Sequence, residues 1–489
     1  MADQLTLAPL FSEGAIIQGE QPVTIFGWGT PGLRVKVALG QSVRQTITPA
    51  NEKWTVQFPA QAYDQTLTLT VAAASASVTR HVQTGDVYLV AGQSNIEYKM
   101  ADDADFEAAR ANFTATNLSF YYTPQVEYET KRRFGWADEP DPRWQKLTAE
   151  NLGQVSAVAY YALTQVAANH PDRPIGMLQC YKGGTSASSW ISEANLKADA
   201  KLADAYVKPY EAAVTGRNQA DFDADEAKYE ATVTAYNQKK AAYIEAHPEL
   251  SLEAVKMHVG HTPWPPPMQP KSYLRPNGLY HTMVQKTAPY TVKAMVWYQG
   301  ENDADHAPLY DRLLPRLITE WRRDLGNPGL PVFVIQLPQY QDEPHHAWAQ
   351  IRQAQWQTSQ ALNDCTLVSL VDTGEHHNIH PVHKQASGER LGQALLSGEG
   401  TPTVVAVDRV ADQISLKVAP ATSLSAKQGD GIEALIDGTW QSVDFELDGT
   451  TLNVKAPKAK ALRYAYRNAP APVIFNEAKL PLSPFLIAF

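Results

Sequence analysis

The chain has 489 residues and a formal net charge of −10, because 42 Lys and Arg residues stand against 52 Asp and Glu residues. Its 44% hydrophobic and 19% charged residues are typical of a folded globular protein, and its length predicts about two to four domains. The negative charge and the lack of a long basic stretch exclude nucleic acid as an expected partner, and no apolar run is long enough to predict a membrane helix.

Two sequence features bear on the compartment and on metal binding. The start of the chain, MADQLTLAPLFSEG, lacks the basic and then apolar pattern of a secretory leader, so we expect a cytoplasmic protein unless a leader was removed. Cys180 and Cys365 are too few for a disulfide framework or a Cys-based zinc site, and we interpret both as core residues.

The N-terminal segment is rich in short β-strand patterns. Residues 23–29, 33–40, 54–60 and 66–71 alternate or cluster β-forming side chains, and Gly, Pro and Asn separate these runs. Strands at such even spacing predict an antiparallel β-sandwich, so we interpret residues 1–82 as an accessory domain.

From about Asp86 the pattern changes to short apolar runs with helical segments between them, and the runs are DVYLVAG, PIGMLQC, KAMVWYQG, PVFVIQL and CTLVSLV. Buried parallel strands have this pattern because helices cover both faces of their sheet. Residues 83–400 are therefore predicted to form an α/β core that binds its ligand at the carboxyl ends of the strands. Strand patterns return after Thr401, and residues 401–489 are predicted to form a second β-module.

A segment rich in Ala, Lys, Asp and Glu, residues 193–271, interrupts the predicted core. Its Phe222, Tyr229, Tyr236 and Tyr243 recur every seven residues and so share one helix stripe. We interpret the segment as an inserted helical hairpin with these aromatic residues buried against the core. The alternatives are a lid, a dimerisation arm or a wall of the substrate site.

Four polar turns at predicted strand ends carry residues capable of acyl transfer. In the first, Gly92 allows a sharp turn that presents the Ser94 hydroxyl, although a serine here also suits a helix N-cap. In the second, Gly183 and Gly184 leave backbone N–H groups open to a ligand, although Thr185 or Ser186 would serve equally as an ordinary cap.

The third turn, QGEND, offers Gln299 and Asn302 as side-chain amides that could donate to an oxyanion, and Glu301 as a residue that positions a loop. The fourth supplies a histidine suited to general acid and base work. It contains four histidines, which also suggest a metal site: His376, His377, His380 and His383. No HExxH spacing or companion cysteine supports that alternative, so we expect no metal and no organic cofactor. Taken together in this order, the four turns describe acyl transfer.

The motifs in these turns resemble the signature blocks of the sialate O-acetylesterase family of SGNH-type hydrolases. The blocks are GQSN at 92–95, GGTSASSW at 183–190, VWYQGEN at 296–302 and IHPVHKQASGERL at 379–391. Both ends of the chain also resemble that family, whereas residues 193–271 fall outside the resemblance. The likeness implies a three-layer α/β/α core with a parallel sheet, flanked by two β-domains and carrying a helical insertion.

The resemblance also implies roles for individual residues. Ser94 would be the nucleophile, His380 the general base, and Gly183 an oxyanion donor together with the Ser94 backbone amide. Gln299 and Asn302 both remain candidates for the third donor.

One position departs from the family pattern, in which an acid often precedes the histidine. Here Asn378 and His377 stand at the corresponding positions, and neither is a carboxylate. A backbone carbonyl would orient His380 in a Ser-His dyad. Otherwise an acid would reach it from a loop, and the candidates are Asp372, Glu375 and Glu301.

These features lead to a hydrolase that removes acetyl groups from carbohydrate hydroxyls by way of an acetyl-enzyme, with a small-molecule or oligosaccharide ester as its partner. The sequence leaves the oligomeric state open, and the inserted helices are the place to look for a contact if the protein forms a homo-oligomer. Two alternatives remain: a general short-chain carboxylesterase, and a carbohydrate-binding protein with a degenerate hydrolase core. Trp190, Trp297 and Tyr298 lie near the turns and could stack on a sugar, although we expect them to pack in the core.

Overall fold

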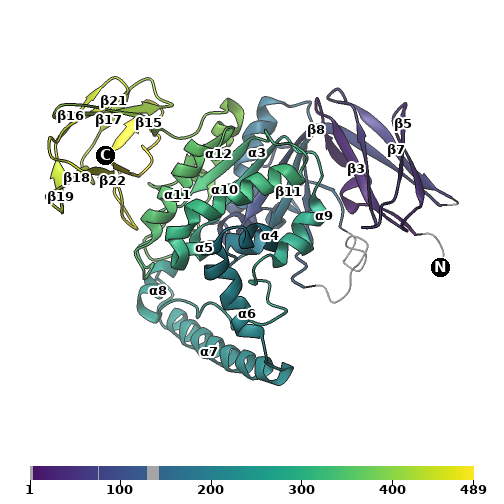
Figure 1. Cartoon of the computed structure of the whole chain (residues 1–489), viewed down its shortest axis with the longest axis horizontal. Coiled ribbons are helices and arrows are strands. Elements are labelled where there is room, and N and C mark those ends of the chain that lie inside the picture. The colour runs from purple at the N-terminus through teal and green to yellow at the C-terminus, as the bar shows by residue number, and fades with distance from the viewer. Residues whose placement is uncertain (1–3, 75, 129–141) are drawn as a thin grey trace.

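The computed structural model describes residues 4–74, 76–128 and 142–489. An N-terminal β-domain, a central α/β domain and a C-terminal β-domain follow one another along the longest axis, and a long helical insertion extends from the central domain (Figure 1). Within the described ranges, no helix combines the length and apolar character that crossing a membrane requires.

Two sheets form the N-terminal domain, as the sequence predicted. One has the order β1-β3-β6, and the other contains β2, β4, β5, β7 and the first half of β8. The strands are β1 (Leu5–Leu7), β2 (Ala15–Gln18), β3 (Val23–Gly29), β4 (Arg34–Leu39), β5 (Ser42–Ile47), β6 (Lys53–Phe58), β7 (Thr66–Ala73) and β8 (Ala76–Gly92), with the short helix η1 at Pro9–Phe11.

The long strand β8 belongs to two domains at once. Its first half pairs with β7 and β2, and its second half, from Asp86 on, pairs with β11 and β12 of the central sheet. The residue 82/83 boundary that the sequence suggested therefore falls inside one continuous strand. At the junction the buried carboxylate of Asp86 accepts hydrogen bonds from both sides, from Gln18 and Tyr63 and from Arg173 and Lys293.

The central sheet has the order β10-β9-β11-β8-β12-β13-β14, and all neighbours except the edge strand β10 are parallel. The α/β class with a parallel sheet is thus confirmed. Besides β8, the strands are β9 (Leu118–Tyr122), β10 (Gln145–Lys146), β11 (Ile175–Tyr181), β12 (Ala294–Tyr298), β13 (Val332–Gln336) and β14 (Cys365–Ser369). The strand order changes direction between β8 and β12, and ligand sites of open α/β sheets lie at such a point.

Helices cover both faces of this sheet. Helix α3 packs against α12, and α10 packs against α11. Because α11 and α12 both contact β13 and β14, the two helix pairs cover opposite faces of the sheet. The Ser156 side chain accepts from the N–H of Ala159 at the start of α3, and Gly398 ends α12 in a left-handed conformation. The helices are α1 (Ser94–Glu97), α2 (Phe106–Ala111), α3 (Ala157–Asn169), α9 (Gln285–Thr287), α10 (Ala307–Asp324), α11 (Trp348–Ala361) and α12 (Gln385–Ser397), with the short helices η2 (Met100–Asp102), η3 (Leu152–Gln154), η4 (Ala187–Trp190), η6 (Tyr280–Val284) and η7 (Glu301–His306).

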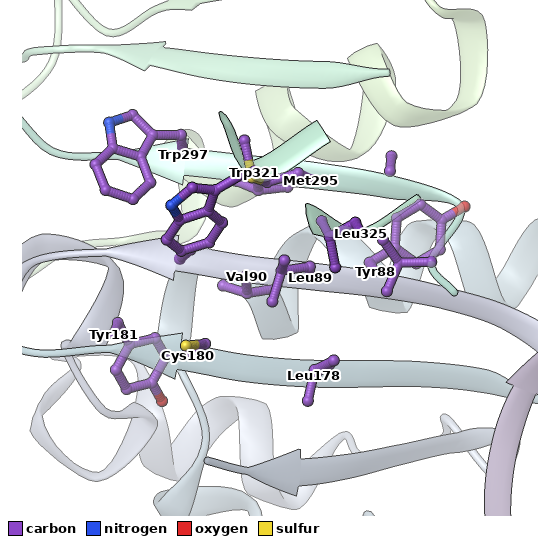
Figure 2. Packing of buried hydrophobic residues seen from close by; sticks show 14 of the residues in the cluster. Tyr88, Leu89, Val90, Leu178, Cys180, Tyr181, Met295, Trp297, Trp321 and Leu325 are labelled. Carbon is purple, nitrogen blue, oxygen red and sulfur yellow. The ribbon is translucent and has the colours of Figure 1, made fainter. Parts of the chain in front are cut away.

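The main core lies between the central sheet and its helices. Figure 2 shows side chains of β8, β11 and β12 meeting residues of α10, among them Val90, Cys180, Trp297 and Trp321. The Trp297 and Trp321 rings lie 5.6 Å apart in an edge-to-face arrangement. Burial raises the pKa of the Cys180 thiol to about 12, so Cys180 is an inert core residue.

The insertion is helical, but its aromatic stripe packs differently from the prediction. Of the four stripe residues, only Phe222 is buried. Tyr229 and Tyr236 donate hydrogen bonds to the carbonyls of Pro263 and Gly260, and Tyr243 stacks on His258, so most of the stripe holds the returning chain of the insertion instead of the core. The elements are α4 (Glu193–Lys197), α5 (Ala200–Leu202), η5 (Ala203–Val207), α6 (Lys208–Val214), α7 (Gln219–Ala246) and α8 (Leu252–Val259), of which α7 extends away from the central domain (Figure 1).

The C-terminal domain has a hydrophobic core of its own, with Leu416, Leu452 and Leu462 among its buried residues. Its sheets have the orders β15-β16-β21-β20, β17-β23 and β19-β18-β22-β24. The strands are β15 (Thr403–Val410), β16 (Gln413–Ala419), β17 (Leu424–Ala426), β18 (Ile432–Ile436), β19 (Thr439–Val443), β20 (Phe445–Asp448), β21 (Thr451–Lys455), β22 (Ala461–Tyr464), β23 (Ile474–Asn476) and β24 (Phe485–Ala488).

Candidate active site

Three neighbouring strands of the central sheet end at the same level, which brings three of the polar turns together. Tyr181 at the end of β11 and Tyr298 at the end of β12 both pair with Gly92 at the end of β8. A Cβ on Gly92 would lie 2.0 Å from the Tyr298 carbonyl oxygen, and the φ of Gly92 is +138°, so only glycine fits here. The first turn of the site therefore packs directly against the backbone of β12 at Gly92.

Ser94 is the first residue of α1, and Gln93 precedes it as the N-cap residue. Ser94 is therefore not the helix cap that the alternative interpretation suggested. The Gln93 backbone N–H donates to the Tyr298 carbonyl, and the Gln93 side-chain oxygen accepts from the N–H of Asn302. These contacts fix the first turn to the third.

His380 meets Ser94 from the loop that follows β14. Its Nε2 lies 2.8 Å from the Ser94 Oγ. The loop is tied down on both sides of His380, because Asn95 donates to the Ile379 carbonyl and the N–H of Val382 donates to Glu375. The structure therefore brings together the two residues that the resemblance implied as nucleophile and base.

The surroundings of His380 favour the neutral imidazole. Burial, together with the positive charges of Lys384 and Lys256, lowers the pKa of His380 to about 3. Lys384 lies four residues after His380, whereas Lys256 comes from α8 of the insertion and donates to the Asn378 side-chain oxygen at 2.6 Å. His380 is thus ready to accept a proton over most of the pH range.

None of the three candidate acids is hydrogen-bonded to the His380 ring within the described part of the chain. Asp372 forms an ion pair with Arg390 at 2.8 Å. Glu375 accepts from the Asn378 side chain and from the N–H of Val382, and Glu301 accepts from Asn95. These carboxylates support the surrounding loops.

Gly183 lies directly against the candidate nucleophile. A Cβ at this position would be 3.5 Å from the Ser94 Cβ. The Gly183 N–H donates to the carboxylate of Glu97, whose other oxygen accepts from Gln125. The backbone donor that the resemblance assigns to the oxyanion is therefore held by an acidic side chain of α1.

The two candidate amides of the third turn occupy different places. Gln299 is fully buried, and its amide nitrogen donates to Gln93, to the Thr185 carbonyl and to Asp303. The side-chain oxygen of Asn302 accepts from the Trp264 indole at 2.9 Å. Gln299 thus braces the loops beneath the site, whereas Asn302 lies at its edge.

The aromatic residues near the turns are either buried in the core or exposed at the edge of the site. Trp190, Trp297 and Tyr298 are buried, as expected of core residues, so they do not face a ligand. Trp264, which no sequence signal singled out, is 45% exposed. Its ring occupies the space that a Cβ on Gly184 would need. The Trp264 side chain therefore packs against the loop that carries Gly183.

The four histidines of the last turn have separate partners. His376 contacts Gln339, His377 contacts Asp342, and His383 contacts Asp105, while His380 contacts Ser94. Among the described residues, no group of three or more His, Cys, Asp or Glu side chains is arranged to hold a metal ion.

Several residues of the site escaped the sequence analysis. Asn95 directly follows Ser94, and Lys384 lies four residues after His380. Both belong to the motifs that resemble the family, so the sequence could have indicated them. Glu97, Lys256 and Trp264 carried none, because their place in the site depends on α1 and on the path of the insertion.

The chain is similar in sequence and in fold to known carbohydrate esterases. Residues 264–397 match the family model described as carbohydrate esterase, sialic acid-specific acetylesterase. Sialate O-acetylesterase of Mus musculus is 24% identical over 421 residues, which covers 77% of this chain and 70% of the relative. That of Homo sapiens is 23% identical over 412 residues, covering 77% and 68%.

A solved structure extends the likeness to the whole chain. A carbohydrate acetylesterase from Xanthomonas citri superposes with a TM-score of 0.73 and 22% identity, covering 98% of this chain and 99% of that protein. The shared fold therefore includes both β-domains and the central domain. These matches confirm the resemblance drawn from the four motifs: residues 264–397 match the model of sialic acid-specific acetylesterases, and the longer alignments are with sialate O-acetylesterases.

Proposed function

We propose that this protein is a serine esterase that removes acetyl groups from the hydroxyls of a carbohydrate. The observation that carries the proposal is the 2.8 Å contact between Ser94 Oγ and His380 Nε2, beside the Gly183 turn at the end of the parallel sheet. A serine and a neutral imidazole in this geometry form an activated nucleophile.

The reaction proceeds in two halves. The Ser94 oxygen attacks the acetyl carbonyl carbon while His380 Nε2 takes the serine proton. The tetrahedral intermediate then collapses, the bond to the sugar oxygen breaks, and His380 returns the proton to that oxygen. In the second half His380 removes a proton from water, and the water oxygen attacks the acetyl-serine carbonyl carbon. The bond to the Ser94 oxygen then breaks, acetate leaves, and His380 returns the proton to Ser94.

Three donors would stabilise the oxyanion: the N–H groups of Gly183 and Ser94 and the side-chain amide of Asn302. We assign the third to Asn302 because Gln299 is already committed to three acceptors beneath the site. The oxyanion then replaces the Glu97 carboxylate as the partner of the Gly183 N–H.

Trp264 supports a carbohydrate as the alcohol part of the ester. Its indole is exposed, yet Asn302 and Gly184 fix it beside the proposed oxyanion donors. An immobilised aromatic face binds the apolar side of a sugar ring at little cost in side-chain entropy. A small alkyl acetate would not use this face.

Acetate release from a panel of esters tests the proposal. The full chain is incubated with O-acetylated sialic acids, acetylated xylo-oligosaccharides, acetylated monosaccharides, methyl acetate and longer-chain acyl esters, and free acid is quantified. We expect release from at least one acetylated sugar, lost on Ser94→Ala with an unchanged circular dichroism spectrum. Equal turnover by Ser94→Ala, or no release from any sugar acetate, would overturn it, and a preference for longer acyl chains would favour the short-chain carboxylesterase alternative.

A further inference from the structure

Asn95 links the loop of the nucleophile to the loop of the base. It directly follows Ser94 and is fully buried. Its side-chain nitrogen donates to the carbonyl of Ile379, the residue before His380, at 3.0 Å. One amide thus connects the neighbours of the two reacting side chains, which are far apart in the chain.

Two ionisable residues fix the orientation of this amide. Lys384 donates to the Asn95 oxygen at 2.7 Å, and the Asn95 nitrogen donates to Glu301 at 2.6 Å. Lys384 and Glu301 are only 2% and 6% exposed. Because a lysine can only donate and a carboxylate accepts, the amide cannot turn over without losing both contacts.

Lys384 and Glu301 have few other ways to be satisfied. The Lys384 ammonium also lies over the Tyr98 ring, 4.5 Å from its centre. The second oxygen of Glu301 is buried and has no hydrogen-bond partner among the described residues. Such an arrangement is costly for stability alone, because burying two ionisable groups rarely repays their desolvation. Its position at the site indicates a functional reason.

We propose that Lys384, Asn95 and Glu301 form a positioning bridge that holds the His380 imidazole against Ser94, in the role that a carboxylate on the ring plays in a Ser-His-Asp triad. The inference rests on the proposed function. None of the three touches the reacting atoms, since the bridge acts through the Ile379 carbonyl and the backbone of α1.

The bridge also sets the charge around the base. Lys384 and Lys256 face His380 and disfavour the imidazolium. Burial lowers the pKa of Lys384 to about 7 against the opposing charges of Glu301, Asp103 and Glu375, so Lys384 is charged at the acidic pH where His380 titrates. Removing the Lys384 charge therefore raises the pKa of His380. This effect separates a positioning role from a structural one, because loss of packing alone leaves the pH profile in place.

The test compares Lys384→Met and Lys384→Arg with the wild type, using methyl acetate and the best acetylated sugar from the panel. For Lys384→Met we expect kcat to fall about 100-fold with little change in KM, since a displacement of about 1 Å costs that much. The acid limb of kcat/KM should move to higher pH. Lys384→Arg keeps the donor and the charge and should restore most of kcat.

Asn95→Ala should lower kcat to a similar degree, because it removes the link to Ile379. Lys286→Met is the matched control: it replaces another buried lysine, in α9, and should leave both kcat and the pH profile unchanged. If Lys384→Met does not fold, Lys384→Gln takes its place, since it removes the charge and keeps a donor.

Two results would overturn the bridge. One is a wild-type kcat in both Lys384→Met and Asn95→Ala, and the other is a lowered kcat with an unmoved acid limb in Lys384→Met or Lys384→Gln. Failure of the proposed function is a different result, since the wild type itself would then release no acetate.

Discussion

The ammonium of Lys256 donates a hydrogen bond to the side-chain oxygen of Asn378, 2.6 Å away. This contact joins α8 of the helical insertion to the loop that carries His380, whose own N–H donates to the same Asn378 oxygen at 3.3 Å. The position where the family pattern often has an acid is thus held by a neutral amide with a cation beside it. His380, the proposed base, thus lies beside the positive charges of Lys256 and Lys384.

The pH profile should report that environment. Because burial and two lysines lower the pKa of His380 to about 3, the base stays deprotonated down to acidic pH. We expect kcat/KM to hold level from neutral pH to about pH 5 and to fall only as the pH nears the lowered pKa. A half-maximal rate near pH 6.5, the ordinary value for histidine, would contradict this environment.

Asn378→Asp should shift the acid limb of the pH profile, where kcat/KM falls, to higher pH. A carboxylate beside His380 stabilises the imidazolium, so the pKa of His380 rises and the acid limb moves to higher pH by about 1 pH unit or more. Asn112→Asp, which adds the same charge on the exposed end of α2, is the control and should leave the limb in place. Rate measurements between pH 3 and pH 8 distinguish the two variants, and identical profiles would refute the argument.

Replacing the nucleophile gives the largest loss. Ser94→Ala should lower kcat by at least about 10,000-fold, because the remaining groups stabilise an oxyanion but form no acetyl-enzyme. Mass spectrometry after rapid quenching should find an added acetyl group on the wild type and none on Ser94→Ala. An acetylated peptide that does not contain Ser94 would assign the nucleophile elsewhere.

Glu97→Gln tests the competition at Gly183. The Glu97 carboxylate holds the Gly183 N–H and places negative charge where the oxyanion develops. Removing that charge should raise kcat several-fold and leave KM nearly unchanged. Glu107→Gln, on the exposed side of α2, controls for loss of a nearby acid. A lower kcat in Glu97→Gln alone would mean that the carboxylate shapes the loop more than it obstructs it.

Trp264 should discriminate between substrates. Trp264→Ala removes the exposed ring, so we expect KM for an acetylated sugar to rise about 10-fold, a loss in line with one aromatic contact, while kcat/KM for methyl acetate changes little. Trp264→Phe keeps an aromatic face and should retain most of the affinity. Trp440→Ala in the C-terminal domain is the control. Equal losses on both esters would assign Trp264 to the integrity of the oxyanion loop.

Much of the fold followed from the sequence because its signals are local. Apolar runs such as DVYLVAG and IGMLQC bury every side chain in a parallel sheet, and the turns that end them must meet at one edge. The meeting of Ser94 and His380 is a consequence of that topology. The antiparallel strands of the N-terminal domain likewise carry their own alternation.

The remaining features depend on contacts that no local pattern encodes. Whether Gln299 or Asn302 faces the site depends on distant partners, because acceptors on Gln93, Thr185 and Asp303 hold the Gln299 amide inward. Lys256 and Trp264 reach the site only because α7 holds the returning chain through its tyrosines. The stripe was recognised, but its partner was misjudged, since a seven-residue spacing says which side chains align and not what they touch.

Strand β8 has a practical consequence for anyone who wishes to isolate the hydrolytic unit. Its 17 residues supply an inner strand of the N-terminal sandwich, between β7 and β2, and then the middle of the sheet that carries Ser94. A truncation at residue 82 would cut this strand in two. The N-terminal domain would lose residues 83–85, which pair with β2, and the central domain would lose the part of β8 that precedes its sheet. Because the N-terminal sandwich and the central domain share strand β8, we expect the two domains to unfold in a single thermal transition.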